Sequence, residues 1–353
     1  MTSRSYDIAT AIFYFFKRFG QKPGAAIWLI VCQIVVLSAL VAGAGALLAP
    51  AVIDLIVSIE AHETGALSEA EMASLMLETL LPIMGMGSLV SIVGILAALM
   101  FQGAWLRFLT RGEVKPGIPY RLGGDELRLF GVNLIYIGLG MAAYIAVAIV
   151  AVIMTVLGAL LIGNADGGSV NVAGSIVFGL IVALTIVGGV AALVIVSLRL
   201  ASAPAMTVLH GGFRFSESWG ASKGVTGNLL ATYLAVFVIA AVANSILSTI
   251  VQLIALGVMA PVMGDMQQAL ESGTVTGIED VFAYLQPLFS QPAILISFSA
   301  LGIVMVIFQI AAEGMVHGVG AYNAVRDAGG EGADLDASRL EAGHPMGASP
   351  SQG

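Results

Sequence analysis

Residues 199–224 read RLASAPAMTVLHGGFRFSESWGASKG and form a polar, basic interruption between two long apolar runs. Arg199 closes the run before it, and Lys223 precedes the run after it. Each run holds more than the ~20 apolar residues that an α-helix needs to cross the hydrocarbon core of a bilayer. The stretch is therefore predicted to be a loop at a membrane surface, between two membrane spans.

The composition of the whole chain agrees with this prediction. Of its 353 residues, 58% are hydrophobic and only 10% are charged, whereas soluble domains carry about 25% charged residues. The apolar runs are continuous rather than alternating, which argues against a membrane β-barrel. We expect an all-α polytopic membrane helix bundle, with about six transmembrane helices and short interfacial amphipathic helices. The six charge-free gaps lie between Lys22 and Asp54, Glu78 and Arg107, Arg128 and Asp166, Asp166 and Arg199, Lys223 and Asp265, and Asp280 and Glu313.

The basic residues predict an orientation. All 14 Lys and Arg residues lie at one set of predicted helix ends, and the alternate connections carry acidic residues only. The positive-inside rule places the basic ends in the cytoplasm, and both termini with them. Both termini can lie on the same side only if the number of spans is even, and six spans meet this condition. We therefore expect a multi-pass protein of the bacterial cytoplasmic (inner) membrane with both termini cytoplasmic.

Three regions are expected along the chain. Residues 1–22 carry apolar side chains at helical spacing, interleaved with Lys17 and Arg18, and are predicted to form a cytoplasmic interfacial amphipathic helix. Residues 23–325 form the six-span membrane domain. Residues 326–353 are polar and rich in glycine, and are predicted to be a disordered cytoplasmic tail.

Short helices are also expected on the outer side. Pro50 is predicted to close the first span. Ser68 and Glu71 have the spacing of a capping box, which predicts a short amphipathic helix over about residues 68–80. Two more short helices are expected before the sixth span, near residues 265–270 and 277–289.

Part of the opening stretch resembles a family pattern, through Arg199-Leu200, Ala203-Pro204, Ser218-Trp219 and Ser222-Lys223-Gly224. The pattern is R-L-x-x-A-x-P followed by S-W-x-x-(S/T)-K-G, and Pro204 comes one residue early. It is similar to the bacterial membrane family named after the membrane domain of glycerophosphoryl diester phosphodiesterase, with its YciC-like relatives. The resemblance covers residues 199–229 and, more loosely, the six-span layout. It implies no phosphodiesterase activity, because the His-Arg-Gly signature does not occur in the chain.

The same stretch is a candidate surface for lipid or for a partner. A short helix from about residue 214 to 224 would bring Arg214 near Glu217. An indole and an ammonium group at this level suit the headgroup zone, where they contact the acyl boundary and the lipid phosphates. The candidate lipid- or partner-facing residues of this cytoplasmic loop are Arg199, Pro204, Arg214, Trp219 and Lys223.

Four polar residues form a candidate intramembrane site: Glu313, His317, Asn244 and Gln252. Glu313 and His317 are four residues apart and share a face of the sixth span. An intramembrane carboxylate is a functional hypothesis by default, and the alternative is that both groups lie at the interface. The GxxxG of Gly314 and Gly318 predicts close helix packing there. The amides of Asn244 and Gln252 either bond to neighbouring helices or line a path.

The motifs that are missing shape the functional hypothesis. No nucleotide-binding glycine loop, HExxH sequence or Ser/His/Asp set occurs, so we expect no enzymatic activity, no cofactor and no metal. We expect an interaction, scaffold or membrane-homeostasis component; the alternative is a transporter or permease component for a small solute or lipid. The expected partners are the bilayer, anionic phospholipids at the cytoplasmic face, and a membrane protein or second copy of the chain, with no nucleic acid.

Overall fold

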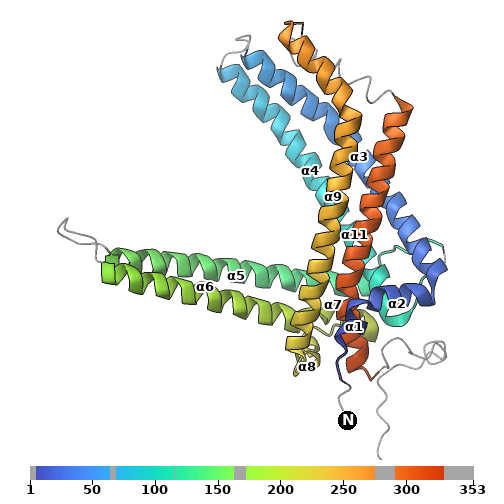
Figure 1. The fold of residues 1–353 in the computed structure, drawn as a ribbon, viewed down its shortest axis with the longest axis vertical. Helices are drawn as coiled ribbons and strands as arrows, with labels where there is room; N and C mark the ends of the chain where they lie inside the picture. Colours follow the sequence, from blue (N-terminus) through green and yellow to red (C-terminus); the bar gives the residue numbers. More distant parts are fainter. Residues whose placement is uncertain (1–4, 64–68, 116, 163–171, 275–290, 330–353) are drawn as a thin grey trace, which may run out of the picture.

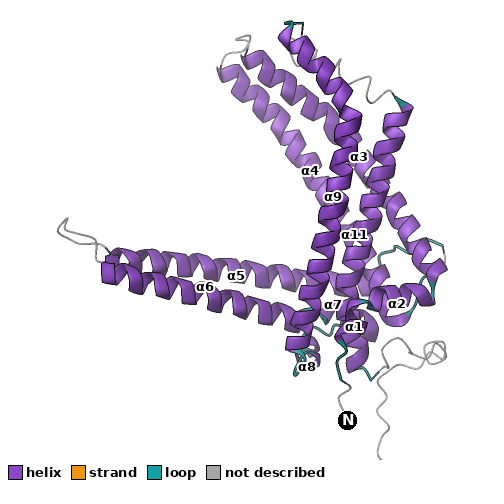
Figure 2. Ribbon diagram, in the orientation of Figure 1, coloured by secondary structure: helices purple, strands orange, loops and turns teal. Residues whose placement is uncertain are grey.

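The computed structural model describes residues 5–63, 69–115, 117–162, 172–274 and 291–329. Within these residues the chain is helical, with no strand (Figure 2). Six helices are long and apolar enough to cross a membrane, which confirms the prediction of an all-α, multi-pass membrane protein. They are α3 (Pro23–Glu63), α4 (Glu69–Arg111), α5 (Gly124–Ile162), α6 (Val172–Leu200), α9 (Thr226–Glu271) and α11 (Pro292–Asp327).

Several segments that were predicted to be separate from the spans are parts of the long helices. Pro50 lies inside α3 and does not end it. The expected outer helix near residues 68–80 is the first part of α4, which begins at Glu69 and continues through Pro82. The expected helix at 265–270 is the last part of α9, which runs through Pro261. These predictions were wrong because membrane helices tolerate proline, since neighbouring groups satisfy the freed backbone carbonyls. The predicted helix at 277–289 and residues 330–353 of the predicted tail lie outside the described residues.

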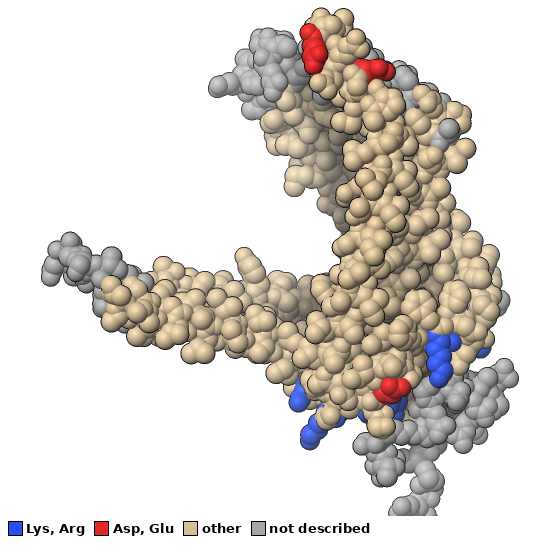
Figure 3. Space-filling view, viewed as in Figure 1, with Lys and Arg blue, Asp and Glu red and all other residues tan. Residues whose placement is uncertain are grey.

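The six long helices diverge from a common end (Figure 1). Helices α3, α4, α9 and α11 run together, whereas the α5–α6 hairpin projects sideways. Lys and Arg side chains gather where the helices converge, and acidic side chains mark the far end of α9 (Figure 3). We call the convergence the basic end. With 39 residues, α5 is about 59 Å long at ~1.5 Å per residue. Spans much longer than the ~30 Å hydrocarbon core fit it by tilting.

The protein core lies at the basic end rather than along the spans. The most apolar windows of the six spans are only 0% to 17% buried inside the protein, so their surfaces are available to lipid. By contrast, residues 203–209 of the short helix α7 (Ala203–His210) are all buried. Helix α7 packs against α4, α5 and α11. The hydrophobic core therefore forms a junction from which the long helices extend.

The N-terminal segment forms two short helices, α1 (Ile8–Ile12) and α2 (Tyr14–Gln21), and both pack on this junction. Asp7 caps α1 by accepting from the backbone N–H of Ala9 at 3.1 Å. Tyr14 and Phe15 are buried against the protein, whereas Phe13 and Phe16 are exposed. One face of the segment therefore packs against the protein and the other is exposed. Its place at the membrane interface stays a prediction.

Close packing at the GxxxG motif is confirmed, with a short helix as the partner. The ring of Phe15 lies where a side chain on Gly314 would stand. At Gly318, a side chain would meet the backbone nitrogen of Phe15 at 3.2 Å. The two glycines therefore let α2 dock directly on the backbone of α11.

Candidate functional site

Helix α7 is held by an arginine at its C-terminal end. The guanidinium of Arg111 donates to the carbonyl of Val208 and, at 3.4 Å, to the carbonyl of Leu209. The last carbonyls of a helix lack intrahelical donors and carry partial negative charge, so a cation there supplies both hydrogen bonds and charge. Gly211 ends the helix in a left-handed conformation, with φ of 61°.

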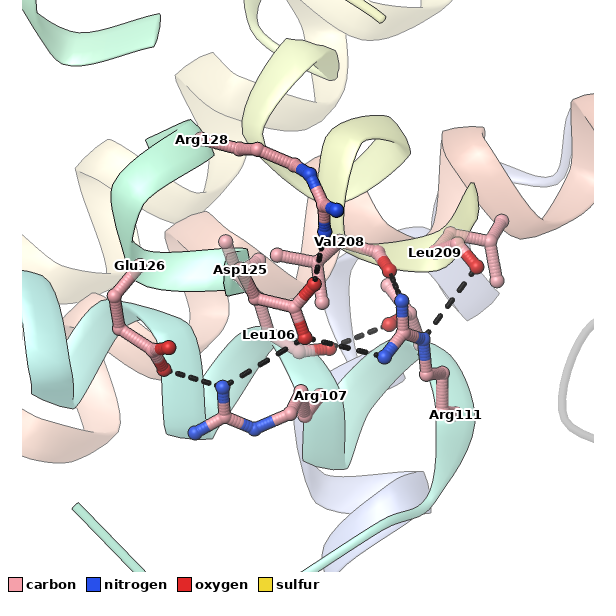
Figure 4. A network of polar contacts seen from close by, with 9 residues as sticks. Leu106, Arg107, Arg111, Asp125, Glu126, Arg128, Val208 and Leu209 are labelled. Atoms are coloured by element: carbon pink, nitrogen blue, oxygen red, sulfur yellow. Dashed lines mark hydrogen bonds and ion pairs between the residues drawn. The ribbon is translucent and has the colours of Figure 1, made fainter. Parts of the chain in front are cut away.

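The same arginine belongs to a buried ion-pair network (Figure 4). Asp125 and Glu126 open α5, where the helix dipole favours carboxylates. Asp125 pairs with Arg111 and with Arg128, each at 3.2 Å. Arg107 pairs with Glu126, which is only 2% exposed. Asp125 and Arg128 lie three residues apart on α5, whereas the other partners of the two carboxylates come from α4.

Gly103 makes room for the buried carboxylate. A side chain at Gly103 would overlap the carboxylate of Glu126. The backbone of α4 therefore approaches the first turn of α5 closely, and this approach seats Glu126 beside Arg107. The network joins the C-terminal turns of α4 to the first turn of α5.

Groups of the N-terminal segment satisfy the C-terminal carbonyls of α4. Arg18 Nε and Tyr14 Oη donate to the carbonyl of Leu109 at 3.0 and 3.1 Å. Lys22 Nζ donates to the carbonyl of Gly112 at 3.0 Å. Burial raises the pKa of Tyr14 above its ordinary value, although the Arg18 guanidinium opposes the shift. The phenol therefore stays protonated and remains a donor at neutral pH.

The predicted cytoplasmic loop folds on itself. Helix α8 (Glu217–Ala221) places Trp219 under the guanidinium of Arg199, 4.7 Å from the ring centroid. Ser218 and Ser222 donate to the backbone carbonyl of Arg199 at 2.9 and 3.2 Å. Most of the residues that carry the family resemblance are thus brought together, and they cap the end of α6.

The other residues of this loop divide into buried and exposed groups. Pro204 lies in the first turn of α7 and is buried, which contradicts its predicted place on a lipid- or partner-facing surface. Arg214 pairs with Glu217 as the spacing predicted, and both are exposed. Trp219 and Lys223 are also exposed, and their contact with lipid or a partner stays a prediction.

The C-terminal turns of α11 close the junction. Asn323 donates to the hydroxyl of Ser202 at 2.8 Å. Arg326 donates to Asn323 at 2.9 Å and to the carbonyl of Ala221 at 3.0 Å. Most of the arginines at the basic end therefore bind backbone or side chains of the protein. In the described part of the chain, Lys17, Lys22, Arg121 and Lys223 are exposed and have no ion-pair partner within 4 Å, although Lys22 is hydrogen-bonded to the carbonyl of Gly112.

Beside the junction lies a cavity of about 540 Å³ that draws its polar groups from four spans. We call it the amide cavity, and its other walls are mostly aliphatic. It contains the predicted pair Glu313 and His317, and four amides that the sequence did not single out. Its polar lining residues are Gln33 of α3, Gln102 of α4, Asn133 of α5, and Gln309, Glu313 and His317 of α11.

Hydrogen bonds order part of this lining. Trp105 donates its indole N–H to Gln33 at 2.8 Å, and Asn133 donates to Gln102 at 2.8 Å. Gln309 donates to one oxygen of Glu313 at 2.7 Å. In the described residues, the other Glu313 oxygen and the side-chain oxygens of Gln309 and Asn133 accept no hydrogen bond. The cavity therefore offers free acceptors.

A second cavity of about 700 Å³ adjoins the first, and both are bordered by Gln102 and His317. Its lining includes Tyr136, whose hydroxyl donates to the carbonyl of Leu200 at 2.5 Å. The imidazole of His317 therefore stands between two cavities. No group of three or more His, Cys, Asp or Glu side chains in the described ranges is placed to hold a metal ion.

Asn244 and Gln252 do not belong to this site. Both are exposed on α9 and border neither cavity. Within the described part of the chain, neither hydrogen bonds to another helix, and a role for them in lining a path stays a prediction. Polarity singled out these residues in the sequence, but it gave no information on which face of α9 they occupy.

Comparison with protein-family models, with curated proteins and with solved structures found no match for this chain. The resemblance of residues 199–229 to the phosphodiesterase membrane-domain family therefore stays a prediction.

Proposed function

We propose that this chain is a non-catalytic membrane-homeostasis protein of the bacterial cytoplasmic membrane that holds a lipid in the amide cavity. In this proposal the basic end is cytoplasmic and acts as the rigid part, and the cavity is the binding site. The alternative of a purely structural scaffold leaves the cavity without a role.

One observation carries the proposal: six polar side chains from four spans converge on one cavity. Polar groups inside a membrane are costly and mark functional paths or sites. Ligand cavities combine mostly apolar walls with a few polar groups, in volumes of about 300–1,000 Å³. The amide cavity, at about 540 Å³, has this composition and size.

The surroundings of the cavity suit a lipid. Other parts of the protein cover little of the spans, so acyl chains would contact them directly. Lys17, Arg121 and Lys223 are exposed at the basic end, where cations attract anionic headgroups at roughly 1 kcal/mol each. These cations would concentrate lipid near the cavity without being part of it.

Native mass spectrometry of protein extracted with its surrounding lipid tests this proposal. Ala98 borders the cavity and is exposed, so Ala98→Phe adds a phenyl ring to the cavity wall and obstructs the cavity. Ala146→Phe, on an exposed position of α5 that borders neither cavity, is the matched control. We expect one retained phospholipid per chain in wild type and the control, and its loss in Ala98→Phe. Equal retention in all three would contradict the proposal.

A transporter or permease component is the second candidate, because His317 and Gln102 border both cavities. Two adjoining cavities with a titratable group between them are the parts that a path for a solute or lipid would need. The test is flux through proteoliposomes. Under this candidate, Glu313→Ala abolishes flux while the protein still assembles. Unchanged flux would exclude the candidate.

A further inference from the structure

The charge of the amide cavity points to the chemistry of its ligand. Glu313 is the one carboxylate among its lining residues, and no Lys or Arg borders it. We propose that the cavity binds a primary ammonium group carried on an apolar chain, as in the headgroup of phosphatidylethanolamine. This proposal rests on the proposed function and names the ligand class of the same site.

The carboxylate needs a counter-charge. In the described part of the chain, Glu313 has no Lys or Arg within 4 Å. Its neighbours are the amide of Gln309, which donates at 2.7 Å, and the imidazole of His317 one turn away. An ionised carboxylate at the edge of hydrocarbon is costly unless a cation pairs with it. A ligand ammonium supplies that pair.

The hydrogen-bonding groups match an ammonium as well. An –NH3⁺ group has three donors and no acceptor. The lining residues of the cavity supply acceptors: one oxygen of Glu313 and the side-chain oxygens of Gln309 and Asn133 accept nothing from the described residues. A trimethylated amine has the same charge but no donor. The arrangement therefore discriminates by hydrogen bonding and not by charge alone.

An anionic headgroup fits this cavity poorly. The two buried arginines of the described residues lie outside the cavity lining: Arg107 pairs with Glu126, and Arg18 donates to α4 carbonyls. A phosphate placed against Glu313 would meet like charge in a medium of low dielectric constant. The phosphate of a bound lipid is better placed toward the exposed lysines, while its amine enters the cavity.

Delipidated full-length protein, titrated with short-chain lipids and followed by native mass spectrometry, tests the inference. The probes are dioctanoyl phosphatidylethanolamine, dioctanoyl phosphatidylcholine and octylamine. Glu313→Gln removes the charge and keeps the size. Glu271→Gln is the matched control, because Gln267 donates to Glu271 at 3.1 Å in the same i, i+4 arrangement, on a helix that borders the amide cavity nowhere. Gln309→Met is a second variant that retains the charge and removes one acceptor together with the donor to Glu313.

We expect wild type and Glu271→Gln to bind the ethanolamine lipid about tenfold more tightly than the choline lipid, which corresponds to one hydrogen bond to a charged group at the lower end of its range. Glu313→Gln should weaken the binding of both lipids and reduce the preference, because the remaining acceptor is uncharged, and Gln309→Met should reduce the preference. Competition by octylamine at the same concentration would assign the site to free amines, and no competition would assign it to the lipid. Equal binding of both lipids to wild type, with binding still lost in Ala98→Phe, would overturn the inference and leave the proposed function standing. Binding of no probe at all would overturn both.

Discussion

Trp105 donates its indole N–H to the side-chain oxygen of Gln33 across 2.8 Å, and this bond joins α4 to α3 at the edge of the amide cavity. Trp105→Phe keeps the aromatic packing against Phe15 but leaves the oxygen of Gln33, a residue only 4% exposed, without its donor. An unsatisfied buried acceptor costs about 1–3 kcal/mol. Thermal unfolding in detergent should therefore show a lower melting temperature. Adding Gln33→Leu to Trp105→Phe should restore most of the lost melting temperature. If Trp105→Phe alone is as stable as wild type, this bond does not order the cavity.

The pair of Arg107 and Glu126 is the most buried part of the ion network. Removing one partner of a buried pair leaves the other charge uncompensated, at a cost of about 3–5 kcal/mol. Arg107→Met should thus unfold far more easily in denaturant titrations than wild type, and Arg107→Met with Glu126→Gln should recover much of the loss. Arg214→Met breaks an exposed pair and should change stability by no more than ~1 kcal/mol. Equal effects of the two arginine substitutions would refute the structural role of the network.

The contact of Phe15 with Gly314 should be open to a rescue experiment. Gly314→Ala places a methyl group inside the position of the Phe15 ring, so α2 must move away from α11. Trypsin cleavage at the exposed Lys17 should become faster, because docking no longer protects the segment. Combining Gly314→Ala with Phe15→Ala should restore docking in part. Gly302→Ala, whose added methyl meets nothing within 4 Å, is the control and should leave cleavage unchanged.

Tyr6 should make stability sensitive to alkaline pH. Burial raises the pKa of Tyr6 from its ordinary 10.0 to about 12. The unfolded chain therefore loses this proton first. The contribution of Tyr6 is complete below pH 10 and is lost as the pH rises from 10 toward 12, at up to ~1.4 kcal/mol per pH unit. Melting temperatures measured from pH 9 to 11.5 should fall less steeply in Tyr6→Phe than in wild type. Parallel curves would mean that the Tyr6 phenol ionises equally in both states.

Much of the fold was predictable because hydrocarbon imposes simple rules. Charge-free gaps located all six spans, and the 3-residue spacing of Arg214 and Glu217 predicted their ion pair. The shared face of Glu313 and His317 also held, since both border the amide cavity. Helix boundaries were less predictable, because proline does not end a membrane helix as it ends a soluble one.

The convergence of amides could not be predicted. Helices that are apolar all round carry no stripe that tells which face meets a neighbour. Gln33, Gln102 and Asn133 lie on three different spans, so only the packing of α3, α4 and α5 brings them together. Asn244 and Gln252 have the same chemistry and lie outside the site. The burial of α7 could not be predicted either. This helix has only 8 residues, and a short segment between two spans was expected to be a surface loop.

The most direct test is whether an acyl chain enters the amide cavity. Trp105 borders that cavity. In a variant that carries both Trp28→Phe and Trp219→Phe, Trp105 is the only tryptophan of the chain. Its fluorescence should be quenched by lipids brominated on their acyl chains, and Ala98→Phe should remove most of that quenching. If quenching is the same with the cavity open and filled, lipid reaches Trp105 only from outside, and the amide cavity is not a lipid site.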